Sequence, residues 1–106
     1  MKKRTETPDS VTFAKALADP TRQRIMGLTC CQWLNVSEIV EAVGVSQPTV
    51  SHHLAILRGA GLVNTLSEGK NTFYSLNQDR VAKCCGRLIE VFAPETEAKQ
   101  AIHNVQ

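Results

Sequence analysis

The stretch from Val45 to Arg58 constrains the fold most, because it carries the signature of a helix with one apolar and one polar face. Ser46 can cap such a helix by accepting a hydrogen bond from a free backbone N–H, and Pro48 falls in the first turn, where its missing donor is harmless. The inward residues recur at helical spacing: Val50, His53, Leu54 and Leu57. The opposite face carries Gln47, Thr49, Ser51, His52 and Arg58. A packed back and a hydrogen-bonding front are what a DNA major groove accepts.

Capping residues and apolar spacing predict three helices before this segment. Asp19-Pro20 is a strong start signal, a cap followed by proline at the first helical position. Trp33–Val36 is expected to be a short connection with room for one pair of strand residues. We expect the three helices from Asp9 or Ser10 onward, from Thr21 to about Cys31, and from a Ser37 cap through Val43, with Gly44 ending the third.

After Gly59-Ala60-Gly61 the apolar period changes from helical spacing to alternation. Leu62–Leu66 and Asn71–Leu76 have the composition of strands, and Ser67–Lys70 between them is a turn containing glycine, so the pattern predicts a β-hairpin. A last helix is expected from Asn77 or Gln78 until Pro94 ends it. Its apolar stripe is unbroken: Val81, Cys84, Cys85, Leu88, Ile89 and Phe92.

This order of elements predicts a mostly α-helical winged helix-turn-helix, with the hairpin as the wing. Residues 9–94 form the expected DNA-binding and dimerisation domain, between a flexible basic tail at 1–8 and a polar tail at 95–106. The first and last helices both carry apolar stripes, and so small a chain has few other residues with which to cover them. A homodimer joined through these two helices would cover them.

Composition is compatible with this prediction without demanding it. The chain has 106 residues, a net charge of +2 and a pI of about 8.4, which allow one modest domain with a mildly basic surface. No apolar run of membrane-spanning length is present, and no apolar stretch follows the basic N-terminus as in a signal peptide. We therefore expect a cytoplasmic protein without membrane contact, whose cysteines are mostly reduced at rest.

Several motifs agree, in order, with one family. They are Leu17–Ile25 (LADPTRQRI), Val43–Leu54 (VGVSQPTVSHHL), Leu57–Val63 (LRGAGLV) and Gly69–Tyr74 (GKNTFY). Over roughly residues 11–92 the chain resembles the arsenic- and metal-sensing repressors of the ArsR/SmtB family. The resemblance implies a homodimeric repressor that releases double-stranded operator DNA when an inducer binds or modifies it.

The chain departs from the two familiar metal sites of that family. Where the family places cysteines before and inside the third helix, this sequence reads Trp33–Glu38, without a thiol. Where the family places Asp, His, His and Glu along the last helix, the nearest matches are Gln78, Arg80, Val91 and Pro94. We expect no metal and no other cofactor at these positions, so any sensing must use the four cysteines.

Six residues are the predicted DNA contacts. Gln47, Thr49, Ser51 and His52 are expected near base edges, because amide and hydroxyl groups pair well there, and Arg58 nearer a phosphate. Lys70 at the hairpin tip is expected to reach the DNA backbone or minor groove. For Asn71 beside it, a turn residue without DNA contact is as good an interpretation as a DNA contact. His53 is expected to be packed and hydrogen-bonded in the core.

The cysteines form two adjacent pairs, and neither matches a Cys-x-x-Cys motif. Cys84 and Cys85 lie on the apolar stripe, where packing is the simpler interpretation, although nearby Arg80, Lys83 and Arg87 can lower a thiol pKa. Cys30 and Cys31 fall at a helix end. Adjacent Cα atoms are ~3.8 Å apart, less than the ~4.4 Å lower limit of ordinary disulfides, so a bond there would be easily reduced. Easy reduction suits a reversible switch, although a helix C-terminus disfavours a thiolate.

The leading hypothesis is therefore a non-enzymatic repressor whose operator binding is relieved by cysteine oxidation, for example by peroxide, with a disulfide at Cys30–Cys31. The nearest alternative keeps the repressor and makes the inducer arsenite or another thiophilic ion, held by thiolates drawn from Cys30, Cys31, Cys84 and Cys85. Alternatives of other classes are a thiol oxidoreductase, a metal carrier, and a winged helix that binds only protein.

Overall fold

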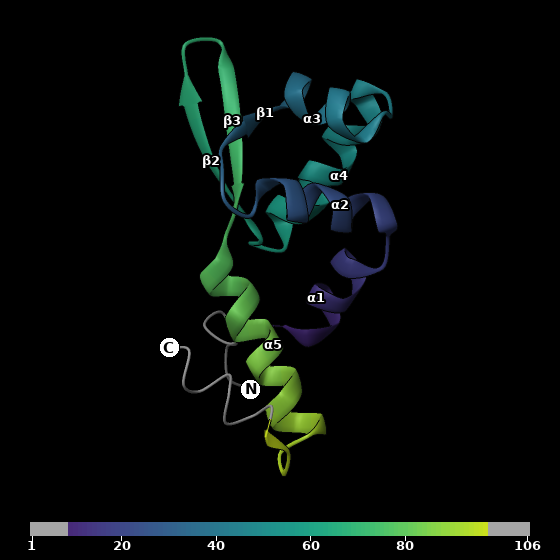
Figure 1. The fold of residues 1–106 in the computed structure, drawn as a ribbon, viewed down its shortest axis with the longest axis vertical. Coiled ribbons are helices and arrows are strands. Elements are labelled where there is room, and N and C mark those ends of the chain that lie inside the picture. Colours follow the sequence, from purple (N-terminus) through teal and green to yellow (C-terminus); the bar gives the residue numbers. More distant parts are fainter. Residues whose placement is uncertain (1–8, 98–106) are drawn as a thin grey trace.

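The computed structural model describes residues 9–97 as a helical body from which a hairpin and a long helix extend in opposite directions (Figure 1). The predicted tail at 1–8 and most of the one at 95–106 lie outside the described residues. The elements are α1 (Ser10–Leu17), α2 (Pro20–Thr29), β1 (Leu34–Asn35), α3 (Val36–Val43), α4 (Gln47–Gly59), β2 (Val63–Glu68), β3 (Asn71–Leu76) and α5 (Gln78–Phe92).

Side-chain caps begin the helices, and most lie where the sequence predicts them. Asp9 accepts a hydrogen bond from the backbone N–H of Val11, and Asp19 accepts from those of Thr21 and Arg22. Ser46 and Asn77 cap α4 and α5 in the same way. Each cap satisfies a backbone donor that the first helical turn leaves free.

The start of α3 differs from the prediction, because its cap is Asn35 and not Ser37. The Asn35 side chain accepts from the backbone N–H of Glu38 at 2.9 Å, and the Glu38 carboxylate accepts from the backbone N–H of Asn35 at 2.9 Å. This reciprocal pair is a capping box. Asn35 is held extended because it also pairs with Phe73 of β3, so the helix starts directly after the strand.

The three strands form an antiparallel sheet in the order β1-β3-β2. The hairpin register runs from Val63 opposite Leu76 to Glu68 opposite Asn71, so the loop contains only Gly69 and Lys70 and is tighter than the predicted turn. Gly69 has a φ of 63° there, a conformation that glycine adopts without steric cost. The two-residue β1 adds a short third strand, with Leu34 opposite Tyr74.

The core lies between α2, α3, α4 and the base of the hairpin. Its fully buried apolar side chains include Ile25, Ile39, Val50, Leu54, Leu57 and Leu62. The inward face predicted for α4 is therefore confirmed, and it fixes that helix from behind. In contrast, Val11 of α1 is 60% exposed and Phe92 of α5 is 76% exposed. Within residues 9–97, no helix is long and apolar enough to cross a lipid bilayer.

Candidate nucleic-acid interface

The exposed face of α4 carries all five helix residues predicted to meet DNA. Gln47, Ser51 and Arg58 follow one another at i, i+4 and i+11, along the side of the helix nearest the wing. Thr49 lies about 160° around the helix from Gln47. Its hydroxyl is 2.9 Å from that of Ser46, so it also belongs to the cap of α4. His52 is exposed between these two sides.

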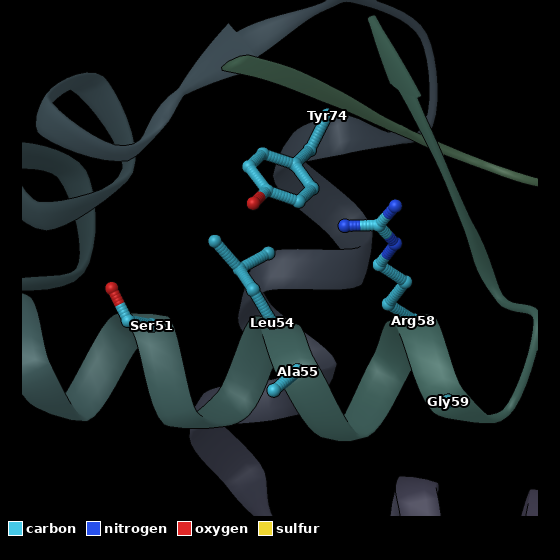
Figure 2. Close-up of a pocket in the computed structure, with 6 residues that line it drawn as sticks. All are labelled: Ser51, Leu54, Ala55, Arg58, Gly59 and Tyr74. Carbon is cyan, nitrogen blue, oxygen red and sulfur yellow. The ribbon is translucent and has the colours of Figure 1, made fainter. Parts of the chain in front are cut away.

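A cleft of about 380 Å³ separates α4 from the wing strand β3 (Figure 2). Ser51, Ala55 and Arg58 line it from the helix, above a floor that includes Leu54, and Tyr74 lines it from β3. Sequence reasoning missed Tyr74, because its place opposite α4 follows from sheet pairing that no local pattern records. An aromatic residue on a predicted wing strand was the one signal available.

The hairpin tip presents Lys70 and Asn71, both exposed. Lys70 occupies the second position of the two-residue loop, and Asn71 begins β3 opposite Glu68. The tip therefore carries one cation on a short arm beyond the helical body (Figure 1).

The back of α4 is anchored by a buried polar contact at His53, which is 8% exposed, in agreement with its predicted core position. Nδ1 of His53 lies 3.1 Å from Nη1 of Arg22. A guanidinium can only donate, so Nδ1 accepts and the ring proton sits on Nε2. Nε2 in turn lies 3.9 Å from the carboxylate of Asp19. One imidazole thus connects the recognition helix to the start of α2.

Two arginines of α2 tie together the ends of the neighbouring helices. Arg22 donates from Nε to the carbonyl of Ala16 at 2.8 Å and from Nη2 to that of Lys15 at 3.0 Å. Arg24 donates to the carbonyls of Ala42 and Val43 at 3.2 and 3.3 Å. The carbonyls of Ala16, Ala42 and Val43 lie in the last turns of α1 and α3, where helical partners run out, whereas that of Lys15 also accepts from the backbone N–H of Ala18. The frame that carries α4 is therefore cross-linked by hydrogen bonds to cations.

The two cysteine pairs lie in different surroundings. Cys30 caps the C-terminus of α2 and is half-buried, whereas Cys31 after it is exposed. The sulfur atoms of the two residues are in contact. The backbone carbonyl of Cys30 accepts a hydrogen bond from the Gln78 side chain at the start of α5. Cys84 is 3% exposed, and burial raises the pKa of its thiol. Half-buried Cys85 packs against the same core.

The geometry offers no assembled metal site in the part of the chain that the structure describes. Residues 9–97 contain no group of three or more His, Cys, Asp or Glu side chains placed to hold a metal ion. The cysteine pairs at the end of α2 and within α5 do not form one cluster of ligands.

Residues 19–65 match the family described as "Bacterial regulatory protein, arsR family". The nodulation protein NolR of Rhizobium meliloti is 33% identical over 86 residues, which cover 81% of this chain and 70% of NolR. The chain belongs to the ArsR family. A second relative, the "Probable mercury resistance operon repressor" of Streptomyces lividans, is 41% identical over 76 residues, covering 71% of this chain and 61% of that protein.

Solved structures agree with this assignment. The crystal structure of NolR from Sinorhizobium fredii superposes with a TM-score of 0.66 at 32% identity, covering 78% of this chain and 83% of that one. The winged helix-turn-helix predicted from the sequence is therefore confirmed as an ArsR-family fold. This chain spans between 61% and 70% of the length of these two curated relatives.

The contacts of Asp19 predict a pH dependence of stability. The backbone N–H of Arg22, and then that of Thr21, hydrogen-bonds to the carboxylate and holds its pKa below the ordinary 3.8, against an opposing effect of desolvation. A lowered folded-state pKa stabilises the fold above the unfolded value, and this contribution is lost as the pH falls through the folded value. Asp19→Asn keeps a capping side chain but removes the charge.

We expect the free-energy difference between wild type and Asp19→Asn to be largest near neutral pH and to shrink below pH 3.8. Urea unfolding across this range measures it, and the same substitution at exposed Asp79 is the control. A difference that stays constant with pH would show that the Asp19 charge contributes nothing to the fold.

Proposed function

We propose that this ArsR-family chain is a homodimeric transcriptional repressor that binds operator DNA through α4 and the wing. The observation that carries this proposal is the exposed polar face of α4, which stands on a fully buried apolar back and lies beside a basic-tipped hairpin. The relative named as a mercury resistance operon repressor supports the same function. A helix held this firmly can insert its side chains in a groove with little loss of conformational freedom.

The proposed dimer uses α1 and α5, as the apolar stripes predict. A hollow of about 460 Å³ lies between these helices, lined on one side by Val11 and Ala14 and on the other by Leu88 and Phe92. The high exposure of Val11 and Phe92 is a reason to expect a covering partner. A second copy of the chain would also duplicate the modest positive charge at the DNA.

For the inducer, we propose oxidation of Cys30 and Cys31. Hydrogen peroxide takes both thiol hydrogens and two electrons, forming one disulfide and two waters, by way of a sulfenic acid. Two contacts connect this pair to the rest of the protein. The Cys30 carbonyl is bound by Gln78 of α5, and β1, three residues after Cys31, pairs with the wing. A backbone change at the pair therefore reaches both the proposed dimer helix and the DNA-binding hairpin.

A thiophilic ion is the alternative inducer, favoured by the named role of the mercury resistance relative. Soft thiolates suit such ions. Within the described residues of one chain, however, no three ligands lie together, so this alternative needs rearrangement of the helices or thiols from both protomers. Peroxide titration should consume thiols without retained metal, whereas arsenite should remain bound near one per site.

The dimer proposal predicts the spacing of operator half-sites. Two recognition helices related by a twofold axis should meet successive major grooves, so half-site centres should lie ~10 bp apart or a multiple of that. Footprinting and sedimentation of the complex measure spacing and stoichiometry. A single half-site occupied by one chain would contradict the proposal.

The recognition face predicts a loss of sequence discrimination on mutation. Gln47→Ala or Ser51→Ala should weaken cognate binding by ~1–3 kcal/mol and leave non-specific binding unchanged, because a base-edge contact is lost. Lys70→Ala should weaken both and flatten the salt dependence, because a phosphate contact is lost. Equal losses on cognate and random DNA for Gln47→Ala would exclude base reading by this residue.

The switch proposal predicts which thiols respond to peroxide. Cys30→Ser and Cys31→Ser should each bind DNA as the reduced wild type does and should not release it with peroxide, whereas the wild type loses roughly ten- to a hundredfold in affinity, or ~1.4–3 kcal/mol. Peptide mass mapping should find a two-hydrogen loss within the Cys30–Cys31 peptide.

The matched control is Cys84→Ser, which should keep the peroxide response but lower the free energy of unfolding by ~1–3 kcal/mol, because it buries a hydroxyl. A cross-link from Cys30 or Cys31 to Cys84 or Cys85 would instead identify a bond between α2 and α5. A normal response in both Cys30→Ser and Cys31→Ser would exclude this pair as the sensor.

A further inference from the structure

We propose that the cleft between α4 and β3 seats the sugar–phosphate backbone of one DNA strand, with Arg58 and Tyr74 binding the same phosphate. This inference rests on the proposed DNA binding and adds a specific anchor to it. Tyr74 of the wing strand then contacts DNA directly, and the sugar–phosphate backbone fills the space between α4 and the hairpin.

The geometry of the duplex supplies the first argument. In B-DNA, a single sugar–phosphate strand separates a major groove from the minor groove beside it. If α4 enters the major groove and the Lys70 tip reaches the adjacent minor groove, that strand must cross the space between helix and hairpin. The cleft lined by Arg58 and Tyr74 occupies this space.

The chemistry of the walls fits a nucleotide backbone. Figure 2 shows the Arg58 side chain rising from α4 and the Tyr74 side chain descending from β3, with the guanidinium beside the tyrosine ring and the hydroxyl directed toward the Ser51 end of the cleft, above Leu54. A guanidinium and a phenol are both donors, and together they suit a phosphate oxygen. Leu54 gives the cleft an apolar floor against which a deoxyribose can pack, and Ala55 is a second apolar residue of the lining. Ser51 lies at the same cleft, on the helix face that continues to Gln47.

Both proposed donors are available for a ligand. Among the residues that the structure describes, neither the Arg58 guanidinium nor the Tyr74 hydroxyl has a hydrogen-bond or ion-pair partner. Tyr74 is nonetheless fixed in place, because it lies within β3 between Leu34 of β1 and Thr65 of β2. Its hydroxyl is therefore presented by the central strand of the sheet and not by a loop.

The test compares Tyr74→Phe, Arg58→Lys and Arg58→Ala with wild type, using a DNA fragment that the reduced wild-type protein selects from a random pool. Arg87→Ala, an exposed cation on α5, is the matched control. Binding is measured as a function of salt and on fragments in which single phosphates are replaced by neutral methylphosphonates. Circular dichroism and thermal unfolding establish that each variant folds. If Tyr74→Phe does not fold, the variants of exposed Arg58 still test the proposal.

Tyr74→Phe should bind cognate and random DNA about 3- to 10-fold more weakly at an unchanged salt slope, since it loses one neutral donor. Arg58→Ala should lower the slope by about 0.9, whereas Arg58→Lys and Arg87→Ala should keep it. One methylphosphonate per half-site should weaken wild type, and should cause a much smaller further loss in both Arg58→Ala and Tyr74→Phe.

Wild-type affinity in Tyr74→Phe, or coupling of Arg58 and Tyr74 to different phosphates, would overturn the shared seat while leaving the proposed repressor intact. Failure of the wild-type protein to select any DNA would overturn the proposed function itself, and the seat with it.

Discussion

The guanidinium of Arg22 is the contact on which the orientation of the recognition helix depends. It is fixed by two carbonyls of α1 and holds the imidazole of His53 in the middle of α4. Hydrogen bonds from a charged donor are stronger than neutral ones, and this group lies where water is partly excluded. Replacing it would leave the carbonyl of Ala16 and a ring nitrogen of His53 without this donor, and a polar group left unpaired away from water costs ~1–3 kcal/mol.

Local sequence rules predicted the helices because their signals lie within a few residues of one another. Asp19 followed by Pro20, Ser46 ahead of Pro48, and Gly44 after Val43 each determine a helix end by contacts inside one turn. The apolar face of α4 was predictable for the same reason. Its exposed face was equally predictable, because residues of a surface helix that do not face the core face the solvent.

The errors and omissions arose where distant residues decide the outcome. Ser37 and Asn35 are both good capping residues, and Asn35 prevails because pairing with Phe73, far along the chain, holds it extended. Tyr74 was missed because strand pairing places it opposite α4. The hydrogen bond from Gln78 to the Cys30 carbonyl joins residues 48 positions apart, so no spacing rule could have indicated it.

Asn35 has a mechanical consequence for the wing. This residue is at once the end of β1, paired with the hairpin, and the cap of α3, whose far end is held by Arg24 of α2. The hairpin is therefore attached to the helical body near the middle of β3, at Phe73 and Tyr74, and cannot swing as an independent arm. A protomer built in this way meets DNA as a single stiff template, so variation in groove width has to be absorbed by the duplex or by the angle between two protomers.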